Sequence, residues 1–156
     1  DERVINMERT NIRNVTPEAL DEPIEFFSVD VSFISLHHIF PVAQAITTPD
    51  AMGVCLVKPQ FEAGREKVGK KGVVTDKAVH MEVVEKITQF AMQTGFHLLG
   101  LDFSPIKGPE GNIEYLVHLK KRPEKEARIV ESVDIRGTVD AAFDTLAKKD
   151  PAEEKK

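Results

Sequence analysis

The sequence predicts an α/β protein built on a mainly parallel sheet with one reversed strand. Apolar runs of strand length alternate with helical patterns along the chain, which favours parallel strands joined by helices. The last two predicted strands, 96–103 and 113–119, are separated by a turn cluster rich in Pro and Gly that is too short for a crossover. One of these two strands therefore runs antiparallel, and the whole arrangement is a Rossmann-like layout.

The first half of the chain is expected to form these elements in order: strand 4–7, a short helix from Thr16-Pro17, strand 24–31, helix 36–46 and strand 53–57. Residues 24–31 are nearly continuous in apolar and aromatic residues, a pattern typical of a strand buried on both faces. Ser35 can cap the helix that follows. Pro41 should bend or shorten that helix, because proline cannot donate a backbone hydrogen bond.

The second half is expected to form a long loop over 58–75, helix 76–94, strand 96–103, strand 113–119 and helix 139–146. Helix 76–94 has a clear apolar stripe, formed by Val79, Val83, Ile87, Phe90 and Ala91. The loop over 58–75 contains three glycines, and loops of this length tend to be functional or disordered.

Composition is that of one globular domain of ordinary size. The chain has 156 residues, of which 41% are apolar, and no apolar run approaches the roughly 20 residues of a membrane-spanning helix. We therefore expect a cytoplasmic protein. The single cysteine, Cys55, lies inside an apolar run and is expected in the core. His37 and His38 lack the spacing of a metal site, so no metal is predicted.

Basic residues gather locally although the formal net charge is −5. Charges within about 8 Å determine the field that a nucleic acid meets, so local patches can track phosphates even on an acidic protein. Taken alone, this pattern favours a solvated loop over a phosphate-binding one. The turn at 107–111 could approach a nucleic-acid backbone because its glycines remove side-chain bulk, or it could be a plain hairpin loop. The candidate RNA-binding residues are Arg65, Lys67, Lys70, Lys71 and Lys107.

Three predicted strands meet a charged residue at one edge of the sheet. Asp30 lies at the end of its apolar run, Lys58 follows the next run, and Glu114 opens the reversed strand. The carboxyl ends of parallel strands and the start of an antiparallel one share an edge, where ligands bind in open α/β sheets. These three side chains are thus expected to lie together, either as a functional site or as structural ion pairs.

Four sequence segments, in the same order along the chain, resemble those of the hemolysin A (TlyA) family. This family belongs to the FtsJ-like group of S-adenosylmethionine-dependent RNA methyltransferases. The four segments are MERTN (7–11), VDVSFISL (29–36), LVKPQFE (56–62) and SPIKGPEGNIE (104–114). The resemblance implies a partial methyltransferase domain over 1–122. The charged sequence after Pro123 predicts a C-terminal extension over 123–150, which contains the helix at 139–146, and a disordered tail over 151–156.

This resemblance implies methyl transfer to a ribose 2′-hydroxyl of ribosomal RNA, with S-adenosylmethionine as cofactor and a ribosomal subunit or its RNA as partner. Asp30, Lys58 and Glu114 match three members of the family's Lys-Asp-Lys-Glu tetrad. Glu8, Asn11 and Asp30 match cofactor-binding positions, although Asn11 could equally be a turn-forming residue.

Several parts of the family pattern have no counterpart in this sequence. They are the first tetrad lysine, the glycine-rich cofactor loop, the first two sheet strands and an S4-like RNA-binding module. We therefore expect the C-terminal portion of a longer protein, with an exposed apolar sheet edge where the two strands would pair.

Two other functions remain open at this point. One is a non-catalytic RNA-binding or ribosome-binding module, which the missing glycine loop would favour. The other is a membrane-active hemolysin, which the sequence does not favour because it offers neither a spanning segment nor an interfacial apolar and basic helix.

Overall fold

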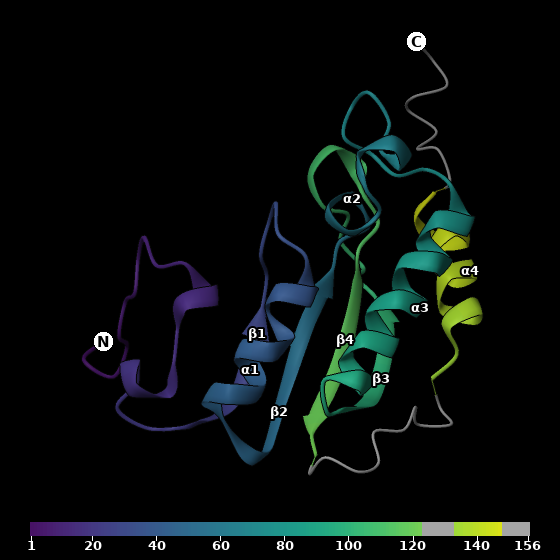
Figure 1. Cartoon of the computed structure of the whole chain (residues 1–156). Helices are drawn as coiled ribbons and strands as arrows, with labels where there is room; N and C mark the ends of the chain where they lie inside the picture. The colour runs from purple at the N-terminus through teal and green to yellow at the C-terminus, as the bar shows by residue number, and fades with distance from the viewer. Residues whose placement is uncertain (123–132, 148–156) are drawn as a thin grey trace.

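The computed structural model describes residues 1–122 and 133–147. Within them, four strands form one sheet in the order β1-β2-β4-β3, with α1 and α3 across one face and α4 beside α3 (Figure 1). The strands are β1 (Ile24–Val29), β2 (Thr47–Val57), β3 (Phe96–Phe103) and β4 (Tyr115–Lys121). The α-helices are α1 (Phe40–Ile46), α2 (Pro59–Glu62), α3 (Lys77–Gln93) and α4 (Ile135–Leu146).

Strand direction follows the prediction of one reversed strand. β1 and β2 pair in parallel, whereas β4 runs antiparallel to both β2 and β3. Consequently β1, β2 and β3 share a direction and β4 opposes them. The carboxyl ends of β1 and β2 therefore lie at the same edge of the sheet as the start of β4.

The α3 helix and the β3 strand lie where the sequence predicted them. The Asp76 side chain caps α3 by accepting a hydrogen bond from the backbone N–H of Ala78, and Gly95 with φ +91° ends the helix in the left-handed region. Val83, Ile87 and Ala91 of the predicted stripe are buried. β3 then begins at Phe96 and ends at Phe103, matching the predicted bounds.

Alternate residues of the central strands build the core beneath the helices. Tyr115, Val117 and Leu119 of β4 are buried together with residues of α3, and α4 contributes Val139 and Ala142. Cys55 is fully buried, as predicted, and burial raises its thiol pKa to about 12. The thiol thus stays protonated and inert near neutral pH.

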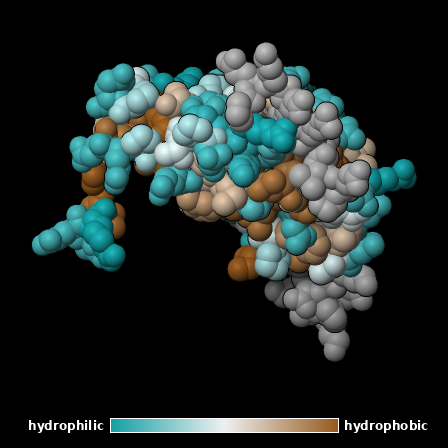
Figure 2. Space-filling model, turned by 90° about the horizontal axis from the view of Figure 1, so that it is seen from below, coloured by the Kyte–Doolittle hydropathy of each residue, from teal (hydrophilic) through white to brown (hydrophobic). Residues whose placement is uncertain are grey.

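The predicted strand at 4–7 is wrong. Residues 1–10 are exposed and contain no strand, and the segment before β1 forms only two 3₁₀ turns, Ile12–Asn14 and Pro17–Ala19. An apolar run becomes a strand only when another strand pairs with it, and none does so here among the described residues. Val4, Ile5 and Met7 therefore remain on the surface, where Figure 2 shows apolar colour along this segment.

The expectation that residues 24–31 form a strand buried on both faces is also wrong. β1 ends at Val29, pairs with no strand but β2 among the described residues, and leaves Phe26 56% exposed. Composition alone cannot reveal whether a second layer covers a strand. The apolar run at 24–31 therefore led to a prediction of more burial than β1 has. The β2 strand is longer than predicted and starts at Thr47, directly after α1.

The other differences are local. The predicted helix 36–46 is divided into a 3₁₀ turn, Leu36–His38, and the short α1, in agreement with the expected effect of Pro41. The predicted loop 58–75 contains α2 and a 3₁₀ turn, Arg65–Lys67. α4 starts one turn earlier than predicted because Asp134 caps it at the Gly137 N–H. The predicted tail 151–156 and most of the link before α4 lie outside the described residues.

Candidate active site

The ends of β1 and β2 bring Asp30 and Lys58 into direct contact. The Lys58 Nζ donates to Asp30 Oδ1 at 2.5 Å, and Ser32 Oγ lies 3.5 Å from the same nitrogen. The Lys58 side chain is only 10% exposed, whereas that of Asp30 is 70% exposed. A largely buried ammonium is thus held by a carboxylate that is itself open to a ligand.

Glu114 lies at the same edge of the sheet but reaches Lys58 only indirectly. Gln60, two residues after Lys58, donates from Nε2 to Glu114 Oε1 at 3.0 Å. Gly108 lies close on the other side, because a Cβ added there would come within 2.2 Å of the same carboxylate oxygen. Glu114 is buried and held between α2 and the turn before β4, and no direct ion pair joins it to Lys58 in the described part of the chain.

Gln60 carries an unusual polar atom for a folded protein. Its Oε1 is buried and has no hydrogen-bond partner among the described residues. The amide cannot simply be reversed, since that would place its oxygen against the Glu114 carboxylate. A buried acceptor without a donor costs free energy, and such groups are often found where function requires them.

A second contact holds the loop after Asp30 against the α2 helix. Ser35 Oγ donates to Glu62 Oε2 at 2.6 Å, and the Leu36 N–H donates to Glu62 Oε1 at 2.9 Å. Burial raises the pKa of Glu62, while these two hydrogen bonds and Lys86 oppose that effect. Glu62 thereby ties the β1 side of the site to the helix that follows Lys58.

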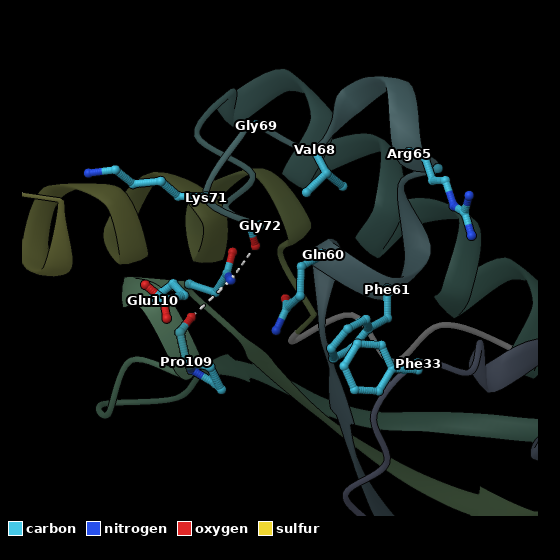
Figure 3. Close-up of a pocket in the computed structure, with 12 residues that line it drawn as sticks. Phe33, Gln60, Phe61, Arg65, Val68, Gly69, Lys71, Gly72, Pro109 and Glu110 are labelled. Atoms are coloured by element: carbon cyan, nitrogen blue, oxygen red, sulfur yellow. Dashed lines mark hydrogen bonds between the residues drawn. The ribbon is translucent and has the colours of Figure 1, made fainter.

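Beside these residues the surface is hollowed into a cleft of about 700 Å³. Its walls are the loop after α2 and the turn between β3 and β4, and Gln60 points toward it (Figure 3). The residues that line the cleft include Phe33, Gln60, Phe61, Arg65, Lys71 and Asn112.

Two aromatic rings stand at the end of the cleft nearest Lys58. The ring centroids of Phe33 and Phe61 are 4.8 Å apart, and Lys58 Nζ lies 6.0 Å from the Phe61 centroid. Phe33 is 90% exposed and has φ +63°, a left-handed conformation that is costly for a bulky residue. Residues held in such strained backbone conformations cluster at active sites and ligand-binding loops.

Glu8 and Asn11, the other two predicted cofactor residues, are not brought to this edge. Glu8 accepts a hydrogen bond from Asn6, and Asn11 caps the 3₁₀ turn that follows it by accepting from the Arg13 N–H. Both lie in the N-terminal segment beside β1 (Figure 1), of which Ile12, next to Asn11, packs against the core. In this structure Asn11 has the turn-forming role that was its alternative.

The predicted RNA-binding residues divide into two groups. Arg65 and Lys71 line the cleft, with their charged ends directed outward from it (Figure 3). Lys67 forms an ion pair with Glu82 at 2.8 Å, and Lys70 and Lys107 are exposed without lining the cleft. The basic residues therefore flank the opening rather than fill it.

Sequence reasoning missed Phe33, Gln60, Phe61 and Asn112. The first three lie inside the sequence segments that resemble the family, within three residues of Asp30 or Lys58. This proximity to two candidate site residues was the signal that could have found them. Asn112 also lies inside such a segment, two residues before Glu114, but its hydrogen bonds to Val74 and Gly72 could not be predicted, because these partners lie 38 and 40 residues away along the chain.

Residues 1–121 match the family described as FtsJ-like methyltransferase. The chain belongs to the FtsJ-like methyltransferase family. This membership confirms the resemblance seen in the sequence and accounts for the mainly parallel sheet with one reversed strand.

Named relatives agree with the FtsJ-like assignment. The chain is 46% identical over 151 residues to "Putative rRNA methyltransferase YqxC" of Bacillus subtilis, covering 96% of this chain and 54% of that protein. It is 40% identical over 125 residues to "16S/23S rRNA (cytidine-2′-O)-methyltransferase TlyA" of Mycobacterium tuberculosis, covering 80% of this chain and 47% of that protein. The chain thus spans about half the length of the curated relatives it matches.

Solved structures show the same FtsJ-like fold. "Putative hemolysin from Streptococcus thermophilus" is 41% identical with a TM-score of 0.88, over 100% of this chain and 55% of that one. A putative hemolysin from Lactococcus lactis is 44% identical with a TM-score of 0.85, over 90% and 67% of the two chains.

The described residues contain neither a membrane-spanning helix nor a cluster suited to a metal ion. None of the helices there has the length and apolar character needed to cross a membrane. The same residues contain no cluster of three or more His, Cys, Asp or Glu side chains suited to a metal ion.

Proposed function

We propose that this chain is the catalytic portion of an S-adenosylmethionine-dependent ribose 2′-O-methyltransferase that acts on ribosomal RNA in the cytoplasm. The observation that carries the proposal is the ion pair between Lys58 and Asp30 at the rim of a cleft with aromatic and basic residues. Membership of the FtsJ-like family supports it, as do the names of the two relatives above.

S-adenosylmethionine is the general cofactor of FtsJ-like methyltransferases, and when bound it supplies an electrophilic methyl group on a positively charged sulfur. The exposed carboxylate of Asp30 fits the positive end of such a molecule. Glu8 and Asn11 are proposed cofactor residues too, but here they hydrogen-bond within their own segment. Only Asp30 of the three therefore has a structural argument for cofactor contact.

The residues of the site suit activation of an alcohol. A ribose 2′-hydroxyl must lose its proton as its oxygen becomes methylated, so a positioned base accelerates the reaction. Lys58 in its uncharged form would accept that proton, and Asp30 would fix the direction of the amine. Glu114, held by Gln60, would orient the ribose.

Recognition of RNA is proposed for the aromatic pair and the basic rim. An unpaired base can stack on Phe33 or Phe61 whatever its identity, and base stacking on an aromatic ring is worth about 1–3 kcal/mol. Phosphates on either side would meet the residues Arg65, Lys67, Lys70, Lys71 and Lys107. Such contacts make RNA binding fall steeply with salt.

Methyl transfer tests the proposal. Ribosomal RNA is incubated with the chain and S-adenosylmethionine labelled in the methyl group, and the RNA is then treated with alkali. A 2′-O-methyl group protects the neighbouring phosphodiester, so the label should appear in alkali-resistant dinucleotides. Replacing Lys58 with Met should lower transfer at least about 100-fold, whereas replacing Lys120, near the opposite end of β4 from Glu114, with Met should not change it. Label on a base, or full activity of the Lys58→Met variant, would contradict the proposal.

The same experiment separates the second candidate function, a non-catalytic RNA-binding module. The arrangement of Glu8 and Asn11 away from Lys58 is the observation that favours it. Salt-dependent RNA binding that survives Lys58→Ala, together with no detectable methyl transfer and no heat of S-adenosylmethionine binding in calorimetry, would support the binding module over the enzyme.

A further inference from the structure

The two walls of the cleft come from distant parts of the chain and are joined by one side chain. Asn112 Oδ1 accepts from the Val74 N–H at 3.2 Å, and its Nδ2 donates to the Gly72 carbonyl at 2.9 Å and to the Pro109 carbonyl at 3.0 Å. The dashed lines of Figure 3 mark the last two bonds: the bond to Gly72 joins the turn to the loop after α2, and the bond to Pro109 lies within the turn. Asn112 thus crosslinks the walls through both ends of its amide.

This crosslink is well defined. Asn112 is only 2% exposed, and its amide has one acceptable orientation, because the oxygen faces a backbone donor and the nitrogen faces two carbonyls. Its own backbone closes the turn between β3 and β4, since the Gly108 N–H donates to the Asn112 carbonyl at 2.7 Å. Neighbouring Gly111, with φ +84°, permits that tight turn.

Val74 is held from its other side by a buried histidine. His80 Nε2 lies 2.7 Å from the Val74 carbonyl, which can only accept, so this nitrogen carries the proton. His80 Nδ1 then accepts a hydrogen bond from the Tyr115 hydroxyl at 2.9 Å. Tyr115 directly follows Glu114 in the chain. The loop is therefore anchored at Val74 by its N–H through Asn112 and by its carbonyl through His80.

The anchored segment presents two lysines. The Gly69 N–H donates to the Val73 carbonyl, and the Gly72 N–H donates back to the Gly69 carbonyl, both at 2.9 Å. These bonds close a small turn with Lys70 and Lys71 at its exposed tip. Since Asn112 binds both Gly72 and Val74, it fixes the base of the turn that carries both charges.

We propose that Asn112 is a positioning residue for RNA, which holds the Lys70-Lys71 turn at a fixed distance from the β3–β4 turn and so sets where phosphates lie relative to Lys58. The proposal rests on the RNA-directed function above and deepens it. Asn112 acts through the two lysines. Their contribution to RNA binding should therefore depend on Asn112, and that dependence can be measured as coupling.

The test is a double-mutant cycle on the 156-residue chain, read by fluorescence anisotropy with a fluorescein-labelled single-stranded RNA of mixed sequence. Asn112→Ala should weaken binding about fivefold to tenfold, because the lysines lose their fixed position. The Lys70→Ala/Lys71→Ala variant should lower the salt slope by about 1.4, because each lysine neutralises one phosphate and each such contact contributes about 0.7 to the slope on a single strand. Adding Asn112→Ala to that variant should change affinity less than about twofold.

Two controls separate positioning from loss of structure. Thr88→Val removes a buried side-chain hydrogen bond in α3 away from the cleft, and should leave RNA affinity unchanged. Hydrogen exchange of the Val74 amide should accelerate in Asn112→Ala but not in Thr88→Val. If Asn112→Ala does not fold, Asn112→Ser, which keeps one hydroxyl for hydrogen bonding, takes its place in the cycle.

Failure of the inference and failure of the proposed function give different results. An equal loss of affinity from Asn112→Ala with and without the two lysines would overturn the positioning role, while RNA binding by the wild-type chain stood. Unchanged affinity and salt slope in Asn112→Ala would also overturn it. No RNA binding by the wild-type chain would overturn the RNA-directed function and this role with it.

Discussion

The two faces of the sheet differ in how far the described residues cover them. On the face beneath α1, α3 and α4, Cys55, Val117 and Leu119 are fully or almost fully buried. Neighbouring residues on the opposite face, Phe26 and Met52, are 56% and 39% exposed. Phe26 and Met52 are register partners in β1 and β2, so the exposure continues across two strands.

The difference shows which part of the molecule depends on its own packing. The cleft, the Asn112 crosslink and Lys58 are attached to strands and helices that pack on the covered face. The predicted cofactor residues Glu8 and Asn11 lie in a segment with no buried residue in either of its 3₁₀ turns. The cleft and Lys58 are therefore attached to the core, whereas the segment that carries Glu8 and Asn11 contributes no buried residue in these turns.

Removing one phenylalanine from each face should give the largest contrast. Phe96 is fully buried and contacts the rings of Phe27 and Phe40, so Phe96→Ala should lower the free energy of unfolding by about 3–5 kcal/mol. Phe26→Ala should lower it by less than about 1 kcal/mol, because the ring is already mostly in water. Urea unfolding followed by circular dichroism measures both. Equal losses would mean that the open face is covered in solution, for example by self-association.

A buried histidine on the covered side should make stability depend on pH. Burial lowers the pKa of His80, although its bond to Val74 and the charge of Asp76 oppose the shift. His80 therefore binds a proton near pH 6.5 in the unfolded chain but only at lower pH in the folded chain. The free energy of unfolding should fall as the pH drops below about 6.5. The fall per group cannot exceed about 1.4 kcal/mol per pH unit.

His80→Gln should flatten this dependence between pH 7.5 and 5.5, as measured by urea unfolding at each pH. Burial also lowers the pKa of His37, but that residue is present in both proteins, so their difference isolates His80. Parallel stability curves for the two proteins would show that His80 does not titrate differently in the folded state.

Deleting residues 1–10 should have the smallest effect. All ten residues are exposed, and their hydrogen bonds stay within the segment, such as that from Asn6 to Glu8. The free energy of unfolding should therefore change by less than about 0.5 kcal/mol. Thermal unfolding of the shortened chain provides the measurement. A large loss of stability would show that the segment packs on the open face and that the contrast between the faces is smaller than described.

Prediction from the sequence succeeded where the signal was local. The 3.6-residue periodicity of α3 and its Asp76 cap are properties of neighbouring residues, as is the apolar run of β3. The placement of Asp30, Lys58 and Glu114 at one edge followed from strand order and direction. The predicted strand at 4–7 failed because a strand needs a partner, which local sequence does not disclose.

The sequence by itself determined the long helix α3, most strands, the family and the edge at which three charged residues gather, because periodicity, turn residues and strand direction are encoded within short stretches of chain. Only the tertiary structure decided that Gln60 supports Glu114 from 54 residues away and that Asn112 joins the two walls of the cleft. Only the structure, too, distinguished the covered face of the sheet from the open one. Each of these depends on which distant groups come within hydrogen-bonding or packing distance, and that is settled when the chain folds as a whole.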